Sequence, residues 1–465
     1  MTGTIPPTLS DIDWLKVLNL SSNKLSGEIP KSLTESTNLE IVDLSNNNLS
    51  GSIPAGVSKL VFLRSLNLKR NKISGELPRA ICKCIQLRML NLGENQISGQ
   101  IPDVLSALKN LTVLNLQKNA FTGAIPPSLG FMYKLEILNF EYNQLTGEIP
   151  GAITNMIKLR QLVLRYNKLS GVIPEKLENL VDLEVLYIDH NELTGLIPKR
   201  FGLLHKCRRI NLSNNRLNGS LPESLSQKDL SIVKEFNLSS NNLSGELSMG
   251  FVTMILLTRA QGVKSFDLTD NKKGFQLPKE IGKLVINAQN MNVSTSQTYL
   301  ANGTTTPTNT TSPTNLQTNS QNKSIASAPA STTKFSTIDL SNLSLTGNFD
   351  DRLLKFAELN GHCDFNTNCT LNLENNFMSG DLSLQVVRYI ALSRQRGRLI
   401  YLSGNRGFIL PSTLGQLGLE LRVLDLSGCS LKKTIPHSID KFPLGCDINF
   451  SNNQLSGELP LGVIK

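Results

Sequence analysis

Apolar and polar positions repeat along the first half of the chain with a spacing of 24 residues. Stretches such as LKVLNLSSN from Leu15 and LEIVDLSNN from Leu39 alternate apolar and polar side chains and then reach an asparagine. This alternation predicts a short β-strand whose apolar side chains face a core. One strand per unit predicts a stack of parallel strands, because a unit of this length buries its apolar face only against its neighbours.

An asparagine follows each predicted strand. An amide side chain can pair with backbone groups of adjacent loops that would otherwise be buried without a partner. We therefore predict that these asparagines turn inward and form a ladder. In the regular part of the chain the ladder consists of Asn23, Asn47, Asn71, Asn95, Asn119, Asn143, Asn167, Asn191 and Asn215.

A glycine lies four residues after each of these asparagines and a proline seven residues after it, as in Gly27 and Pro30. The resulting L-[ST]-G-x-[IL]-P signature resembles the plant-type leucine-rich repeat of receptor kinases, receptor-like proteins and polygalacturonase-inhibiting proteins. The resemblance covers nearly all of residues 1–285 and, less regularly, 335–465. It implies an α/β leucine-rich-repeat solenoid of about 16 repeats, with a curved parallel β-sheet on the concave face and irregular or 3-10 turns on the convex side.

Residues 286–334 interrupt this pattern. Of these 49 residues, 27 are Ser, Thr or Asn, and the charged residues among them are Lys323 and Lys334. Such a segment has too few apolar side chains to offset the entropy of ordering, so we expect a disordered insertion. It resembles the island region of plant receptor-like proteins, and a tolerated loop expansion is the alternative. The chain therefore divides into repeats at 1–285, the insertion at 286–334 and irregular repeats at 335–465.

The register of the repeats predicts an uncapped solenoid. Pro6 occupies the slot of Pro30, so the preceding ladder asparagine would lie before Met1, and the repeat that contains Asn453 and Pro460 has no following strand. We therefore interpret the chain as a fragment, an internal start or an incomplete gene model. The resemblance implies a position on the extracellular face of the plasma membrane or in the cell wall, with membrane attachment only through a segment missing from this chain.

Charge and modification motifs agree with a secreted protein. The net charge of +10 favours acidic partners, but basic and acidic residues are interleaved and no nucleic-acid-binding module is present, so we expect no nucleic-acid partner. Cys363 and Cys369 lie close in an irregular stretch and are a disulfide candidate. Fourteen N-x-[ST] motifs occur, and the glycosylation candidates among them include Asn48, Asn110, Asn242, Asn302, Asn309 and Asn342.

The sequence contains no arrangement typical of catalysis. The four histidines are scattered among different repeats, and neither a phosphate-binding loop nor the kinase signature set is present. His362 beside Cys363 is too little for a zinc site, which needs about four ligands. We expect no enzyme activity, no cofactor and no metal.

The concave face is where a solenoid usually binds a partner. The two residues before each ladder asparagine are small and uncharged in the flanking repeats, as in Ser45-Asn46 and Ser213-Asn214. In six central repeats these two positions include charged or aromatic residues. Tyr and Arg are favoured at interfaces, and the acids can orient basic groups of a partner. The predicted concave-face binding residues are Lys69, Arg70, Glu94, Lys118, Glu141, Tyr142, Arg160, Arg165, Tyr166, Tyr187, Asp189 and His190.

The resemblance implies a recognition ectodomain of a plant receptor-like protein or receptor kinase. It would bind a peptide or protein ligand, with a co-receptor kinase as a further partner, in development or defence signalling. A soluble cell-wall inhibitor of the polygalacturonase-inhibitor type is the second hypothesis, although the chain is long for one. A degenerate fragment without function is the third, and an intracellular scaffold the fourth.

Overall fold

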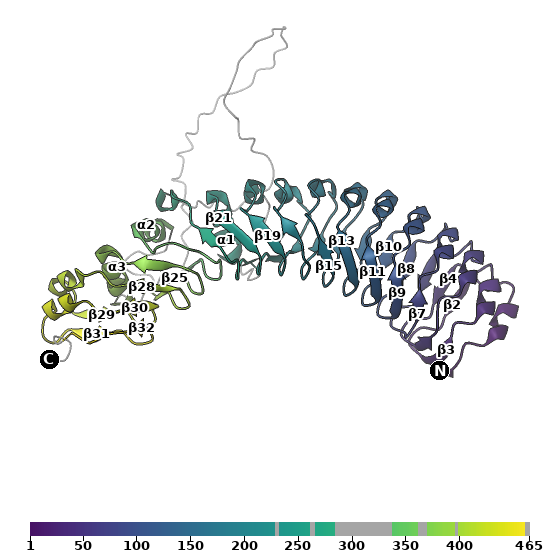
Figure 1. Ribbon diagram of the computed structural model, residues 1–465, viewed down its shortest axis with the longest axis horizontal. Helices are drawn as coiled ribbons and strands as arrows, with labels where there is room; N and C mark the ends of the chain where they lie inside the picture. The colour runs from purple at the N-terminus through teal and green to yellow at the C-terminus, as the bar shows by residue number, and fades with distance from the viewer. Residues whose placement is uncertain (228–231, 261–265, 284–336, 361–369, 396–398, 461–465) are drawn as a thin grey trace, which may run out of the picture.

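The computed structural model describes residues 1–227, 232–260, 266–283, 337–360, 370–395 and 399–460. These residues form an arc in Figure 1 that runs from the N-terminus at the right to the C-terminus at the left. The short helices lie along its outer edge and the strands lie below them. The disulfide candidate Cys363 and Cys369, the glycosylation candidates Asn302 and Asn309, and the predicted insertion 286–334 lie outside the described residues.

Each repeat contributes one strand to the concave face, and these strands pair in parallel with matched register. Leu114, for example, lies beside Leu90 and Leu138. Within the described residues, sixteen concave strands fall into sheets of eleven, three and two strands, which agrees with the predicted number of repeats. They are β2 (Val17–Asn19), β4 (Ile41–Asp43), β6 (Ser65–Asn67), β8 (Met89–Asn91), β10 (Val113–Asn115), β12 (Ile137–Asn139), β14 (Gln161–Val163), β16 (Val185–Tyr187), β18 (Arg209–Asn211), β20 (Glu235–Asn237), β22 (Phe266–Asp267), β24 (Thr337–Asp339), β25 (Thr370–Asn372), β27 (Leu399–Tyr401), β29 (Val423–Asp425) and β31 (Asp447–Asn449).

A second strand follows the ladder residue in most repeats and pairs with its counterpart in the next repeat. Glycines such as Gly27, at φ +80°, adopt the left-handed backbone that this strand requires. The second strands are β1 (Thr2–Gly3), β3 (Lys24–Glu28), β5 (Asn48–Ser50), β7 (Ser74–Glu76), β9 (Gln96–Gln100), β11 (Ala120–Ala124), β13 (Gln144–Glu148), β15 (Lys168–Ser170), β17 (Thr194–Gly195), β19 (Arg216–Gly219), β21 (Asn242–Glu246), β23 (Gly274–Gln276), β26 (Ser379–Asp381), β28 (Gly407–Ile409), β30 (Leu431–Lys433) and β32 (Gln454–Leu455).

The convex side consists mainly of one-turn 3-10 helices, as the resemblance implied. A proline precedes many of them and sets an extended backbone, as at Pro54. The 3-10 helices are η1 (Pro7–Asp11), η2 (Lys31–Glu35), η3 (Ala55–Lys59), η4 (Arg79–Lys83), η5 (Asp103–Ala107), η6 (Pro127–Phe131), η7 (Gly151–Asn155), η8 (Leu177–Asn179), η9 (Phe201–Leu203), η10 (Glu223–Gln227), η11 (Ile281–Lys283), η13 (Leu414–Leu419) and η14 (His437–Lys441).

Three longer repeats carry α-helices on the convex side, which the sequence analysis did not predict. These are α1 (Met249–Ala260), α2 (Asp351–Asn360) and α3 (Leu384–Gln395). The Oγ atoms of Ser248 and Ser383 accept the N–H groups of Phe251 and Val386, so two of the three helices begin at a serine cap. The extra residues in these repeats provide the length that an α-helix needs.

The asparagine ladder is confirmed. The Asn167 Nδ2 donates to the carbonyl oxygens of Phe140 and Leu164, each at 3.0 Å, and its Oδ1 accepts the N–H of Leu145 at 3.0 Å. Each rung therefore joins two neighbouring repeats and satisfies three backbone groups inside the solenoid. The predicted inward position of the apolar strand residues is also confirmed, because Leu114 is fully buried.

Candidate functional site

The residue before each ladder asparagine has a left-handed backbone. Its φ lies between 50° and 59° from Ser22 through Asn214. Asn adopts this region readily, whereas other non-glycine residues incur a cost of roughly 1–2 kcal/mol. We number the repeats from the one that contains Asn23. Repeats three to eight nonetheless place larger residues in this slot, namely Arg70, Glu94, Lys118, Tyr142, Tyr166 and His190. Packing of the repeat does not require these larger side chains, since Ser22 and Asn214 occupy the same slot in flanking repeats.

Three of these side chains form an aromatic stack. The ring centroids of Tyr142 and Tyr166 are 4.2 Å apart with an interplanar angle of 7°, and those of Tyr166 and His190 are 4.1 Å apart at 19°. The Nζ of Lys118 lies 5.8 Å from the Tyr142 ring centroid and extends the stack toward the N-terminus. Identical backbone geometry in consecutive repeats holds the rings face to face, which produces one continuous aromatic surface.

An ion pair and a second aromatic ring lie beside this stack. The Nε of Arg165 donates to the Oε2 of Glu141 at 2.7 Å, and the Arg165 guanidinium carbon lies 5.1 Å from the Tyr187 ring centroid. The Tyr187 hydroxyl donates to the Oε2 of Glu235 at 2.7 Å. Burial and the neighbouring Glu235 carboxylate raise the pKa of Tyr187, so this hydroxyl remains a donor. These contacts fix the orientations of Arg165 and Tyr187 before any ligand arrives.

Asp189 is a buried carboxylate beneath the stack, with 1% of its surface exposed. Its Oδ2 lies 2.9 Å from the Nδ1 of His190, while its Oδ1 is buried without a hydrogen-bond partner among the described residues. Burial raises the pKa of Asp189, although the contact with His190 and the charge of Arg165 oppose this shift. Such a group destabilises the fold when it is ionised.

The other predicted site residues lie apart from the stack. At the N-terminal end, Glu94 accepts from the Nε of Arg70 at 2.9 Å and lies 3.2 Å from the Nζ of Lys69. Partial burial acts to raise the pKa of Glu94, but the hydrogen bonds from Arg70 and Lys69 outweigh it and lower that pKa. Arg160 precedes β14 and pairs with Glu184 at 2.5 Å, so it lies at the opposite end of the strands from Arg165.

Two features of this surface were not found in the sequence. Glu235 binds a tyrosine two repeats away, and a 24-residue period gives no signal for such a contact. The left-handed backbone before the ladder asparagine was also missed, although Asn and Ser in this slot of the flanking repeats are compatible with a tight turn. Among the glycosylation candidates within the described residues, Asn48 is exposed, and Asn110, Asn242 and Asn342 are half-buried.

The described residues contain no group of three or more His, Cys, Asp or Glu side chains placed to hold a metal. Within the same residues, no helix has the length and apolar character needed to cross a bilayer.

Three models of leucine-rich repeats match the chain, a leucine-rich repeat region over residues 2–150 and two leucine-rich-repeat models over 157–217 and 420–442, which together cover about half of it. The chain belongs to the leucine-rich-repeat family, and more particularly it is similar to plant receptor-kinase ectodomains. A comparison with curated proteins found no match.

Solved structures of plant receptors resemble the whole chain. The plant peptide hormone receptor RGFR1 in complex with RGF2 has 27% identity and a TM-score of 0.59, covering 100% of this chain and 59% of its own. The ectodomain of the Arabidopsis receptor kinase HAESA, bound to an N-terminally extended IDA peptide hormone, has 25% identity and a TM-score of 0.61, covering 99% and 61%. The Arabidopsis thaliana GASSHO1/SCHENGEN3 ectodomain, in complex with CASPARIAN STRIP INTEGRITY FACTOR 2, has 26% identity and a TM-score of 0.53, covering 99% and 56%. The chain therefore spans about three fifths of the length of these receptors.

Proposed function

We propose that this chain is part of a plant receptor ectodomain that binds a peptide or protein ligand on the concave face of repeats three to eight. The observation that carries this proposal is the aromatic stack of Tyr142, Tyr166 and His190. Its members occupy strained backbone positions that the flanking repeats fill with Ser or Asn. Strain of this kind, without a benefit to packing, is typical of functional sites.

The composition of the surface suits an extended peptide. The six strands β6 to β16 span about 24 Å, which corresponds to about seven extended residues. The stack offers flat apolar area, and the ion pair of Arg165 with Glu141 offers charged groups of both signs. Aromatic and arginine anchors of fixed geometry lose little side-chain entropy on binding.

The similar receptors support the same class of ligand, because two of them are described as bound to peptide hormones or as peptide hormone receptors. By the same resemblance, we propose an extracellular location and a co-receptor kinase as a further partner. The ligand itself is defined here by its chemistry: an extended segment with an aromatic or aliphatic side chain for the stack and a polar group for Arg165.

A selection experiment tests this proposal. Random peptides about seven residues long, displayed on phage, would be selected on the purified chain. Peptides enriched by the wild type should lose at least about tenfold in affinity for an Arg165→Ala, Tyr166→Ala variant, which corresponds to about 1.4 kcal/mol. The matched control changes Ser213 and Asn214, the same two slots in repeat nine, to Ala. Equal binding by all three proteins, or no enrichment on the wild type, would contradict the proposal.

A further inference from the structure

A row of exposed apolar side chains follows one edge of the solenoid, away from the concave face. Each member comes directly after a buried residue that ends a 3-10 turn, as Ile157 follows Met156 and Val181 follows Leu180. The N–H of Ile157 donates to the Asn155 carbonyl oxygen at 2.9 Å, and the Val181 N–H makes the same contact with Asn179, so the turn directs these side chains outward. The edge row consists of Val61, Ile85, Lys109, Tyr133, Ile157 and Val181.

The apolar side chains of the row are exposed to solvent. Its five apolar members are between 45% and 60% exposed, and Phe62 and Phe131 beside it are 55% and 50% exposed. Contiguous exposed apolar surface of this kind marks an interaction site more often than isolated apolar residues do. The core of each repeat is already filled by the residue before the row, so packing does not explain these side chains.

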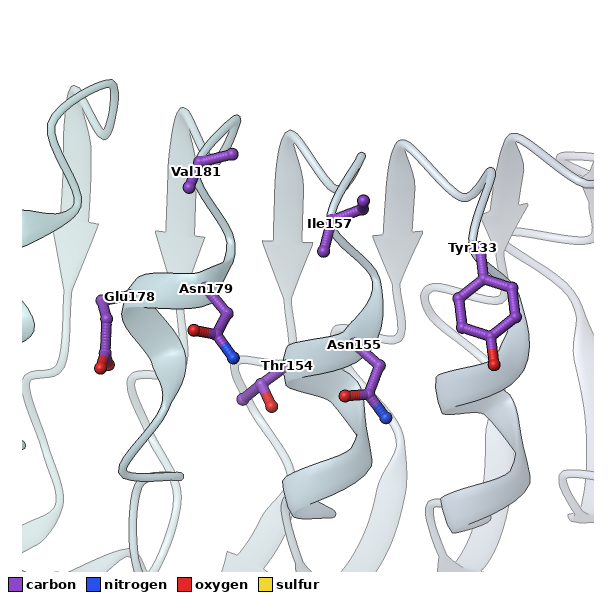
Figure 2. A pocket seen from close by; sticks show the side chains of 7 residues that line it. All are labelled: Tyr133, Thr154, Asn155, Ile157, Glu178, Asn179 and Val181. Carbon is purple, nitrogen blue, oxygen red and sulfur yellow. The ribbon is translucent and has the colours of Figure 1, made fainter.

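The row is continuous from repeat to repeat. Figure 2 shows Tyr133, Ile157 and Val181 at corresponding places in three consecutive repeats, with Asn155 and Asn179 beside them along a shallow depression. The rings of Phe131 and Tyr133 meet edge to face at 6.4 Å. Lys109, the one charged member, lies with its Nζ 5.5 Å from the Phe131 ring centroid and so continues the row toward Tyr133.

The charge along the row is positive. Lys83, Lys134 and Lys158 are exposed beside it and, like Lys109, form no ion pair within the described part of the chain. Two acids lie near Val181, and both face a basic partner: Asp182 pairs with Lys206 at 2.7 Å, and Glu178, which lines the depression, lies 3.8 Å from Arg200. A partner for this edge would therefore carry carboxylates on both sides of an apolar strip.

The spacing of the row indicates the secondary structure of that partner. Concave strands repeat about every 4.8 Å. Each member of the row lies four residues before a concave strand begins, as Ile157 precedes β14 and Val181 precedes β16, so the row follows the spacing of the strands. An α-helix presents one apolar side chain per turn of about 5.4 Å, whereas an extended strand presents same-face side chains about 6.8 Å apart. The helix pitch is the closer of the two to the spacing of the row, and six positions correspond to about 18 helical residues.

We infer that this edge binds an amphipathic α-helix of a partner protein, with its apolar stripe on the edge row and carboxylates facing Lys83, Lys109, Lys134 and Lys158. Helices bind other apolar grooves through anchors spaced in this way. The inference does not depend on the concave site, because its residues lie on a different face of the same repeats.

The glycosylation candidate Asn110 bears directly on this inference. It follows Lys109, its Nδ2 donates to the Ile85 carbonyl oxygen at 3.1 Å, and its Oδ1 accepts from Lys134 at 2.9 Å. A glycan there would cover the middle of the row. The inference therefore requires unmodified Asn110, which mass spectrometry of the chain secreted from plant cells would establish; a glycan on most molecules would overturn it.

Selection from a phage library of random peptides about 20 residues long tests the binding itself. The wild type should enrich acidic peptides with apolar residues at helical spacing, and they should become helical on binding. Ile157→Asp and Val181→Asp should each weaken the selected peptide by at least about tenfold. Lys134→Glu with Lys158→Glu should do the same. Val172→Asp, an equally exposed valine at 51% on another face, is the matched control and should bind like the wild type.

The alternatives give distinct results in the same experiment. No enrichment, strand-like periodicity in the selected peptides, or equal loss on Val172→Asp would overturn the inference. Sodium polygalacturonate serves as a second probe: binding of this polymer that depends on the lysines but not on Ile157 or Val181, without helix selection, would assign the edge to an acidic polysaccharide instead.

Discussion

The first eleven repeats and the last five build the same concave face by different means. The strands from β2 to β22 pair without interruption, whereas β24 to β31 form separate sheets of three and two strands. The two interruptions, between β22 and β24 and between β27 and β29, each follow a repeat that carries a long convex helix, α1 or α3. The strands on either side of each helix do pair, β20 with β22, β24 with β25 and β25 with β27, and no interruption follows α2. A long convex segment alone therefore does not interrupt strand pairing.

A largely buried arginine bridges each interruption. Arg259 at the end of α1 donates to the carbonyl oxygens of Asp339 and Ser341 at 2.9 Å, and its Nη1 lies 3.1 Å from the Asp339 Oδ1. Arg394 at the end of α3 donates in the same way to the Asp425 Oδ1 at 2.9 Å and the Ser427 carbonyl oxygen at 2.7 Å. The guanidinium groups thus donate to backbone carbonyl oxygens that accept a backbone N–H of the neighbouring repeat elsewhere. Side-chain hydrogen bonds replace the interstrand hydrogen bonds at these two places.

The largest expected effects come from the core. Leu114→Ala in β10 and Leu371→Ala in β25 should each cost about 2–5 kcal/mol in the free energy of unfolding, because both leave a cavity in a fully packed repeat. In a solenoid the loss stays local. Hydrogen exchange should therefore report opening around β10 in one variant and around β25 in the other. A near-neutral result for Leu114→Ala would contradict its inward position.

The arginine bridges should come next. Arg259→Met and Arg394→Met should each cost about 3 kcal/mol, since several buried acceptors lose a charged donor. Urea unfolding should then show an earlier transition, of the last five repeats in Arg259→Met and of the last two in Arg394→Met. Arg388→Met is the matched control, because Arg388 lies on α3 but is 49% exposed in a surface pair with Glu420, and it should change stability by less than about 1 kcal/mol. Equal effects of Arg394→Met and Arg388→Met would contradict the bridging role.

Substitutions at ladder positions should change the free energy of unfolding less, and by different amounts in the two regions. Asn119→Ala removes donations to Leu92 and Leu116 and the acceptor of the Ile97 N–H, at a cost of about 2–3 kcal/mol. Cys429 occupies the same slot in a C-terminal repeat, where the Ser430 Oγ donates to Leu402 in place of an amide. Cys429→Ala should therefore cost only about 1 kcal/mol. Chemical denaturation of both variants checks the order, and the reverse order would be inconsistent with this account.

The smallest effect concerns pH within the regular region, where Asp189 and Ser213 occupy equivalent buried slots. The pKa of Asp189 is raised in the folded state, so the folded chain holds this proton more tightly than the unfolded chain does. Its contribution to stability should fall as pH rises from the ordinary aspartate pKa through the raised one. Asp189→Ser should remove this slope and be more stable than the wild type at neutral pH. A stability difference between the two proteins that does not vary with pH would refute this.

Much of the fold could be predicted from the sequence because the same residue types recur at the same positions of each repeat. Leu114, Asn167 and Gly27 occupy slots whose roles follow from the 24-residue period. Arg259 and Arg394 escaped prediction, since each acts across repeats of unequal length. The stack of Tyr142 and Tyr166 was located as a surface but not as stacked rings, because the left-handed backbone that aligns them is visible only in three dimensions.

One measurement tests most directly the claim that the central concave surface serves binding at the expense of stability. A variant combining Glu141→Ser, Tyr142→Asn, Arg165→Ser, Tyr166→Asn, Asp189→Ser and His190→Asn gives three central repeats the residues of Ser45-Asn46 and Ser213-Asn214. Relief of backbone strain and of the buried carboxylate should offset the lost stacking, so its free energy of unfolding should stay within about 2 kcal/mol of the wild type while selected peptides no longer bind. A much larger loss of stability would mean that these side chains hold the solenoid together, and would contradict the account.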